Sequence, residues 1–166
     1  MQDFLLISKP TTMQSLEELI NKLESFVPKA ELKNIEVSQA TIGWQIEHSL
    51  LVLNGIITQL ELSVPEEFVR KFNLKKFIIF TTKKIPRGKV RAPKTVIPSE
   101  ETTQENLLNN LQTAKKNVEK MKILPKYAFF KHPFFDHLNK KDTYKFLQLH
   151  TIHHVKIIQE IAQNKS

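Results

Sequence analysis

Three histidines lie within five positions in the C-terminal part of this chain. They are His150, His153 and His154, in the otherwise largely aliphatic stretch LQLHTIHHVKII (147–158). Imidazole nitrogens are common ligands of divalent transition metals. The spacing of four residues puts His150 and His154 on one face of a helix, one turn apart, whereas His153 points about 100° away from His154. The pair could therefore supply two ligands to a single ion.

A further histidine occurs about a hundred residues earlier. His48 lies in GWQIEHSLLVLNG (43–55), where it shares a helical face with apolar residues. Two packed helices lie about 8–10 Å apart, which suits one ion held by three imidazoles at about 2.0–2.1 Å each. Buried neutral imidazoles without a shared partner would leave several polar nitrogens to satisfy. We predict a metal site on His48, His150 and His154. The alternative is a set of core histidines, each with its own hydrogen bond.

Composition limits what else the chain can use. It has 166 residues, 40% of them hydrophobic, and we expect residues 1–166 to form a single domain. Cysteine is absent. A thiolate site and a cysteine nucleophile are therefore excluded, and any metal must be held by nitrogen and oxygen. Imidazole ligands suit Zn, Ni and Fe alike, so the identity of the divalent metal ion stays open.

Positive charge is concentrated in one segment. The net charge is +8, and residues 68–99 contain no acidic residue. The basic residues of this segment are Arg70, Lys71, Lys75, Lys76, Lys83, Lys84, Arg87, Lys89, Arg91 and Lys94. Such a segment could bind phosphate, nucleic acid or an anionic substrate. No aromatic residue lies between Lys83 and Lys94, however, and nucleic-acid sites usually interleave aromatic with basic residues. We therefore expect a solvated loop and no nucleic-acid partner.

No stretch of the chain has the eighteen or so uninterrupted apolar residues of a membrane span, and its start has too short an apolar run for a secretory signal. We expect a cytoplasmic protein with no membrane partner. The sequence does not determine the oligomeric state, and a homodimer is one possibility.

The elements that must position the histidines are helices. Ser15 and Glu18 form a capping box for a first helix that ends before Pro28. A second helix is predicted from near Ser38 to about Leu62. Residues 66–82 are predicted to begin with a short helix, and the apolar piece that ends this stretch has no assigned state. Thr102 and Glu105 are predicted to form a capping box for a further helix, and Asn139 caps the last one.

Four helices of useful length and no convincing alternating strand pattern predict an all-α fold, a four-helix bundle. The stretch between the last two helices, KILPKYAFFKHPFFDHL (122–138), is aromatic and irregular. The connection TTKKIPRGKVRAPKTVIPSEE (81–101) is rich in proline and too long for a turn. At least one crossover between the helices is therefore expected to be long.

Several motifs occur together in a fixed order. They are Glu47-His48, Arg87-Gly88-Lys89 with Ala92-Pro93-Lys94, His132-Pro133-Phe134-Phe135, and HTIHH (150–154). In this combination the chain resembles the DinB/YfiT-like family of metal-dependent proteins, in a less characterised branch of that superfamily. The resemblance covers most of the chain from about Ser38 onward. It implies a four-helix bundle with a divalent metal on His48, His150 and His154. Certain relatives act as thiol transferases and others as hydrolases or isomerases, so the resemblance makes a metal-dependent hydrolase or transferase possible and leaves the reaction open.

The chain departs from the family pattern at two places. Asp136 follows the H-P-F-F segment where a glycine is expected, and Tyr144 stands where a tryptophan often opens the last helix. Neither position is a ligand. Both could change the shape of the entrance to the site, so the substrates of relatives do not carry over to this chain.

Other side chains near the site are expected to have lesser roles. Candidates to hold the outer imidazole nitrogens or to move protons are Gln45, Glu47, Asp136, Asp142 and His153. Of these, Glu47 is expected to be a solvated neighbour of His48. His132 and His137 are expected to be half-exposed packing and turn residues. Trp44 and the phenylalanines of 129–135 are expected in the core, with a pocket wall as the second choice.

Three classes of function follow from these observations. With three protein ligands, a divalent ion keeps open positions and could activate water or a thiol on a small-molecule substrate, as a hydrolase or a thiol S-transferase does. In the second class the metal has no catalytic role and only stabilises the helical bundle. In the third class the basic loop from Lys83 to Lys94 makes the protein an anion- or nucleic-acid-binding module.

Overall fold

The computed structural model describes residues 13–87, 94–98 and 102–163. In these ranges the chain is mainly helical, with one small sheet. The α-helices are α1 (Leu16–Glu24), α2 (Ile42–Leu62), α3 (Leu74–Thr82), α4 (Gln104–Ile123) and α5 (Lys140–Gln163). Short 3-10 turns cover Val27–Lys29, Pro65–Glu67 and Lys94–Val96. The prediction of a helical protein is confirmed at this level.

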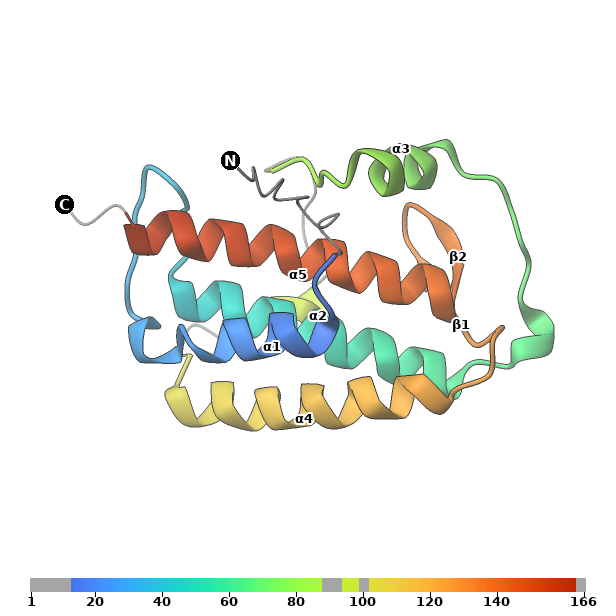
Figure 1. The fold of residues 1–166 in the computed structure, drawn as a ribbon, viewed down its shortest axis with the longest axis horizontal. Coiled ribbons are helices and arrows are strands. Elements are labelled where there is room, and N and C mark those ends of the chain that lie inside the picture. Colours follow the sequence, from blue (N-terminus) through green and yellow to red (C-terminus); the bar gives the residue numbers. More distant parts are fainter. Residues whose placement is uncertain (1–12, 88–93, 99–101, 164–166) are drawn as a thin grey trace, which may run out of the picture.

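Four of the helices pack alongside one another, and α3 lies apart from them (Figure 1). Helix α2 contacts both α4 and α5, and α1 contacts the same two helices. Their buried faces form one apolar cluster that includes Leu16, Ile46, Leu111 and Ile158. Helix α2 is buried around most of its circumference, as its apolar sequence predicts for a central helix. The packing of α2 against α5 is what brings His48 close to the C-terminal histidines.

Helix α1 begins as the sequence predicts. The Ser15 hydroxyl accepts a hydrogen bond from the backbone N–H of Glu18 at 3.1 Å, and the Glu18 carboxylate accepts one from the N–H of Ser15 at 2.8 Å. The predicted capping box is therefore confirmed. Both bonds satisfy N–H groups that a helix start leaves without partners.

Helix α2 starts three residues later than predicted. Its cap is Thr41, whose hydroxyl accepts a hydrogen bond from the N–H of Trp44. Ser38 instead accepts hydrogen bonds from the N–H of Ala40 and from the side-chain amide of Gln45. Two residues of good capping type compete here, and the one nearer the apolar run forms the cap.

The segment before α3 differs from its prediction. The short helix expected after Leu62 is only a 3-10 turn, and the apolar piece without an assigned state, LKKFIIFTT, is the helix. Asn73 caps it by accepting a hydrogen bond from the N–H of Lys76 at 2.9 Å. No residue of α3 is buried. The apolar residues of α3 lie on two faces of the helix, so the sequence lacks the single apolar stripe by which an amphipathic helix is recognised.

The expectation of an all-α fold without strands is wrong in one place. Strands β1 (Phe129–His132) and β2 (Asp136–Asn139) pair antiparallel within the stretch that the sequence indicates as irregular. Each has four residues, too few for alternation to be recognised. Asp136 follows the tight turn with a φ of 61°, a left-handed conformation that favours glycine. The glycine expected there from the family resemblance fits this conformation.

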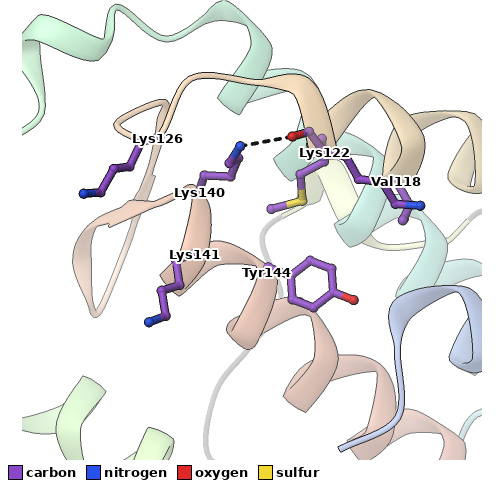
Figure 2. Close-up of a pocket in the computed structure, with 7 residues that line it drawn as sticks. Val118, Lys122, Lys126, Lys140, Lys141 and Tyr144 are labelled. Carbon is purple, nitrogen blue, oxygen red and sulfur yellow. Dashed lines mark hydrogen bonds between the residues drawn. The ribbon is translucent and has the colours of Figure 1, made fainter.

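Helix α5 starts at Lys140, with the Asn139 side chain accepting a hydrogen bond from the N–H of Asp142 at 2.9 Å, as predicted. The Lys140 ammonium reaches across to the end of α4, where it donates to the backbone carbonyl of Lys122 (Figure 2). It also donates to the backbone carbonyl of Leu124. Lys122 and Lys140 border a hollow of about 250 Å³ that Tyr144 also lines. One lysine thus joins the C-terminus of α4 to the start of α5.

The long crossover between α2 and α4 contains α3 and two 3-10 turns. Gly88 to Pro93, which include most of the basic loop motif, lie outside the described residues. Within the described ranges, no helix combines the length and the apolar character that spanning a bilayer requires.

Candidate metal centre

The structure brings His48, His150 and His154 together between α2 and α5. One potential ligand atom of each lies within 4.8 Å of those of the other two. Their ring centroids are 5.3 Å apart for His48 and His150, 4.8 Å for His48 and His154, and 4.5 Å for His150 and His154. The predicted convergence of one ring from α2 with two rings from α5 is present. The same three residues are close enough to hold a divalent ion.

The separation of two ring nitrogens fits a shared ion. Nε2 of His150 and Nε2 of His154 are 3.3 Å apart. Two nitrogens at about 2.0–2.1 Å from one tetrahedral ion lie roughly 3.3 Å from each other. The same distance suits an N–H···N hydrogen bond when one ring is protonated at Nε2. Both arrangements need the two Nε2 atoms to face each other, and they do.

Hydrogen bonds hold the outer nitrogens of two rings. Nδ1 of His48 lies 2.7 Å from the carbonyl oxygen of Val96, and Nδ1 of His154 lies 2.7 Å from the side-chain Oε1 of Gln45. A carbonyl oxygen can only accept, so Nδ1 carries the proton in both rings. Each Nε2 then presents its lone pair, the arrangement that a metal-binding histidine adopts.

Packing orients the third ring. Nδ1 of His150 is buried and has no hydrogen-bond partner in the described part of the chain. Its ring packs beside Phe146, with centroids 5.8 Å apart. His48 and His154 are buried, whereas His150 is partly exposed. The exposure of His150 does not extend to its Nδ1, which is buried.

All three imidazoles favour the neutral form. Burial lowers the pKa of His48, and the carbonyl of Val96 opposes this only in part. Burial lowers the pKa of His150 and of His154 well below the ordinary value, and the neighbouring imidazoles add to the effect. A ligating histidine must be neutral, so proton competition for these rings begins only at acidic pH.

Trp44 and His153 flank the triad. The ring of Trp44 stacks on His48 with centroids 5.0 Å apart, and it also lines a cavity of about 360 Å³ together with Pro98 and Thr102. None of the three histidines lines this cavity, so a role for Trp44 in a pocket beside the ion stays a prediction. His153 packs edge-on against His154 at 5.0 Å but lies outside the cluster of possible ligands.

Of the residues expected to surround the ligands, Gln45 lies as predicted and Glu47 does not. Gln45 contacts His154 as predicted, and Ser38 holds its amide nitrogen. The expectation that Glu47 is solvated is wrong. Its side chain is only 6% exposed and accepts a hydrogen bond from the hydroxyl of Thr102 at 2.6 Å. Thr102 comes from the far end of the long crossover, so a sequence pattern in α2 does not reveal this contact.

The two aspartates considered near the site lie elsewhere. Asp142 pairs with Lys76 of α3 at 3.1 Å, and Asp136 pairs with Lys71 at 3.4 Å. Both attach the segment around α3 to the hairpin and α5. They do not contact the three histidines, because in each case a lysine of the basic segment takes the carboxylate.

His132 and His137 are turn and packing residues, as predicted. Nδ1 of His132 accepts hydrogen bonds from the N–H groups of Phe134 and Phe135, and burial lowers its pKa to about 4. Its ring stacks on Phe135 with centroids 4.2 Å apart. His137 accepts a hydrogen bond from the N–H of Val69.

The backbone carbonyl of Val96 is the contact that sequence reasoning missed. Any residue supplies a carbonyl, so its type gives no signal. Comparison of the chain with protein-family models, with curated proteins and with solved structures found no match. The three histidines and their neighbours are therefore the basis for inferring a function.

Proposed function

We propose that this protein is a DinB-like four-helix-bundle protein that binds a divalent metal ion through His48, His150 and His154. The observation that supports the proposal is the convergence of three imidazoles from two helices, two of which, His48 and His154, present Nε2 because a hydrogen bond holds the outer Nδ1. Zn, Ni and Fe all accept imidazole ligands, and the donor set does not distinguish among them. The DinB-like part of the proposal is supported by the order of the sequence motifs from Glu47-His48 in α2 to HTIHH in α5.

The residues around the triad fit a catalytic site better than a closed structural one. Three protein ligands leave coordination positions open, and His150 is partly exposed to solvent. When bound, a divalent ion there would supply Lewis acidity and lower the pKa of a bound water or thiol. Gln45 and the Val96 carbonyl hold two rings in the ligating tautomer, and the indole of Trp44 shields one side of His48.

Two reaction classes match this chemistry. The first is hydrolysis of a small-molecule substrate by activated water, and the second is transfer of an activated low-molecular-weight thiol. The chain has no cysteine, so the thiol would have to come from the substrate side. A non-catalytic role, in which the ion only joins α2 to α5, is the alternative. It also fits the position of the triad between those two helices.

Elemental analysis of tag-free protein tests the proposal. Wild-type protein loaded with Zn²⁺ and dialysed should retain about one equivalent, and His150→Ala should retain far less, because two imidazoles seldom hold an ion through dialysis. His137→Ala is the matched control, since it removes a histidine outside the triad. Equal metal content in wild type and His150→Ala would rule out this site.

A second measurement separates catalysis from stapling. Apo and metal-loaded protein are assayed on activated esters and phosphate esters, and on an electrophile with a low-molecular-weight thiol. Metal-dependent turnover that His150→Ala abolishes would support the enzyme. Retained metal with no turnover in either assay, together with a large loss of thermal stability on chelation, would support the staple.

A further inference from the structure

Helix α3 carries an apolar face that points away from the protein. Leu74, Phe77 and Ile78 follow the i, i+3, i+4 rule on this face, and Phe72 precedes it. Phe72 is 82% exposed, Leu74 60% and Phe77 58%. The rings of Phe72 and Phe77 contact each other. We call these four residues and Phe134, whose carbonyl accepts a hydrogen bond from Asn73, the α3 patch.

The opposite face of α3 is attached to the rest of the molecule. Ile79 and Phe80 pack against the core, and the ammonium of Lys76 pairs with Asp142 at the start of α5. Lys71, just before α3, pairs with Asp136 of the hairpin. These contacts fix which face of the helix is outward. In Figure 1, α3 stands at the edge of the molecule, above the hairpin and α5.

The α3 patch is surrounded by positive charge. Arg70 precedes it, Lys75 lies over the ring of Phe134 at 5.8 Å, and Lys83 and Lys84 follow the last turn. All four are exposed, and none forms an ion pair with an acidic residue in the described ranges. No acidic residue occurs from 68 to 99. Clustered phenylalanines beside lysines and arginines are typical of segments that lie in the interface of an anionic membrane.

We propose that the α3 patch docks this protein onto an anionic lipid surface, with the phenylalanines in the headgroup region and the basic residues on acidic lipids. A symmetric dimer through the same patch would place one basic surface against its own copy, and the resulting repulsion disfavours it. A bilayer surface supplies negative charge and accepts a protruding convex helix without a matching groove. The proposal does not depend on metal binding.

Vesicle co-sedimentation tests the proposal on the full chain. Wild-type protein should sediment with phosphatidylcholine vesicles that contain phosphatidylserine, and much less with phosphatidylcholine alone. Binding should weaken as salt is raised, because salt screens charges at a surface. Phe72→Ser with Phe77→Ser should reduce binding at least about tenfold. The matched control is Ile123→Ser, which removes an 85% exposed apolar side chain at the end of α4.

Charge is tested separately. Lys83→Gln with Lys84→Gln should lower the partition coefficient roughly twentyfold or more, since each basic residue near an anionic surface contributes about fivefold. Lys29→Gln with Lys33→Gln is the control, because it removes the same charge from an exposed site before α2. Circular dichroism checks that all variants remain helical.

Three outcomes would overturn the proposal. The first is equal sedimentation of wild type with both kinds of vesicle, and the second is equal binding by the α3 patch variants and their controls. The third is a wild-type protein that does not bind vesicles but self-associates with increasing concentration, and becomes monomeric in Phe72→Ser with Phe77→Ser. That result would assign the α3 patch to a second copy of the chain.

Discussion

Gln45 of α2 fixes the orientation and tautomer of His154 in α5. Its Oε1 accepts the Nδ1–H of His154, and Ser38 holds the other end of the amide. Such outer contacts orient a ligating imidazole and raise its basicity. The carbonyl of Val96 does the same for His48, but a backbone atom cannot be removed by substitution.

Gln45→Leu is therefore expected to weaken Zn²⁺ binding by about 10- to 100-fold, because His154 loses its acceptor. Gln45→Glu keeps an acceptor and should bind at least as tightly as wild type. Competition with a chromophoric chelator measures both affinities. Gln59→Leu, an exposed glutamine on the same helix, is the control and should have no effect. Unchanged affinity in Gln45→Leu would mean that His154 does not ligate through Nε2.

His132 provides a test of acid sensitivity away from the triad. Its pKa is lowered by burial to about 4 in the folded protein, whereas an unfolded chain has a value near 6.5. The neutral ring thus adds stability above about pH 6.5, and this contribution is lost as the pH falls toward 4.

His132→Asn keeps an acceptor for the turn and removes the titration. The difference in unfolding free energy between wild type and variant should shrink by on the order of 3 kcal/mol between pH 7 and pH 4. Urea unfolding at several pH values measures it. A constant difference across that range would show that the ring of His132 is not protonated on unfolding.

Single residues also show where sequence reasoning succeeds. The inward direction of His48, His150 and His154 follows from helical periodicity, a property of the local backbone, and it could be predicted. The burial of Glu47 depends on Thr102, a partner from a different part of the chain. Spacing within one helix carries no information about such a partner.

At the scale of elements, the joint between α4 and α5 depends on Lys140. A helix C-terminus leaves carbonyls without partners, and the Lys140 ammonium donates to those of Lys122 and Leu124. Figure 2 shows the first of these bonds. Ammonium groups are also favoured at this end of the helix dipole.

Lys140→Met should lower the free energy of unfolding by about 1–3 kcal/mol, because two charge-assisted hydrogen bonds are lost, one of them part-buried. Urea denaturation measures the change. Lys141→Met alters the exposed neighbouring lysine and should stay within about 0.5 kcal/mol of wild type. Equal effects of the two substitutions would contradict the bridging role of Lys140.

Long elements with one apolar face were predictable, and short ones were not. Ser15 and Asn139 locate the starts of α1 and α5 to the residue, because each side chain accepts a hydrogen bond from the N–H three residues ahead. The capping box predicted at Thr102 is wrong, since Thr103 caps α4. The hairpin has strands of four residues, and its formation depends on long-range packing. Helix α3 was missed for a different reason, since its second apolar face has no partner within the described chain.

At the scale of the molecule, an ion on the triad should raise the melting temperature. A ligand that binds only the folded state at about a hundred times its Kd stabilises that state by about 2.7 kcal/mol. For a chain of this length the melting temperature should then rise by roughly 5–10 °C.

Scanning calorimetry with Zn²⁺ and with a chelator measures this shift. His150→Ala should show no rise with Zn²⁺, which separates the triad from weak surface sites. A rise of the same size in His150→Ala would place the stabilising ion elsewhere.

The charge distribution bears on the molecule as a whole. The expectation of no membrane partner depended on the absence of a spanning segment, which the described helices agree with. It did not consider a basic helix lying flat, because exposure of the α3 patch is visible only in three dimensions.

The distance along the chain between His48 and the other two rings has a kinetic consequence. An ion held by all three closes a loop of about a hundred residues, so it can form its full set of bonds only after α2 and α5 have docked. Added metal should therefore leave the refolding rate nearly unchanged and slow unfolding instead. Where proteolysis requires unfolding, a protease should therefore degrade the metal-bound protein more slowly than the metal-free protein.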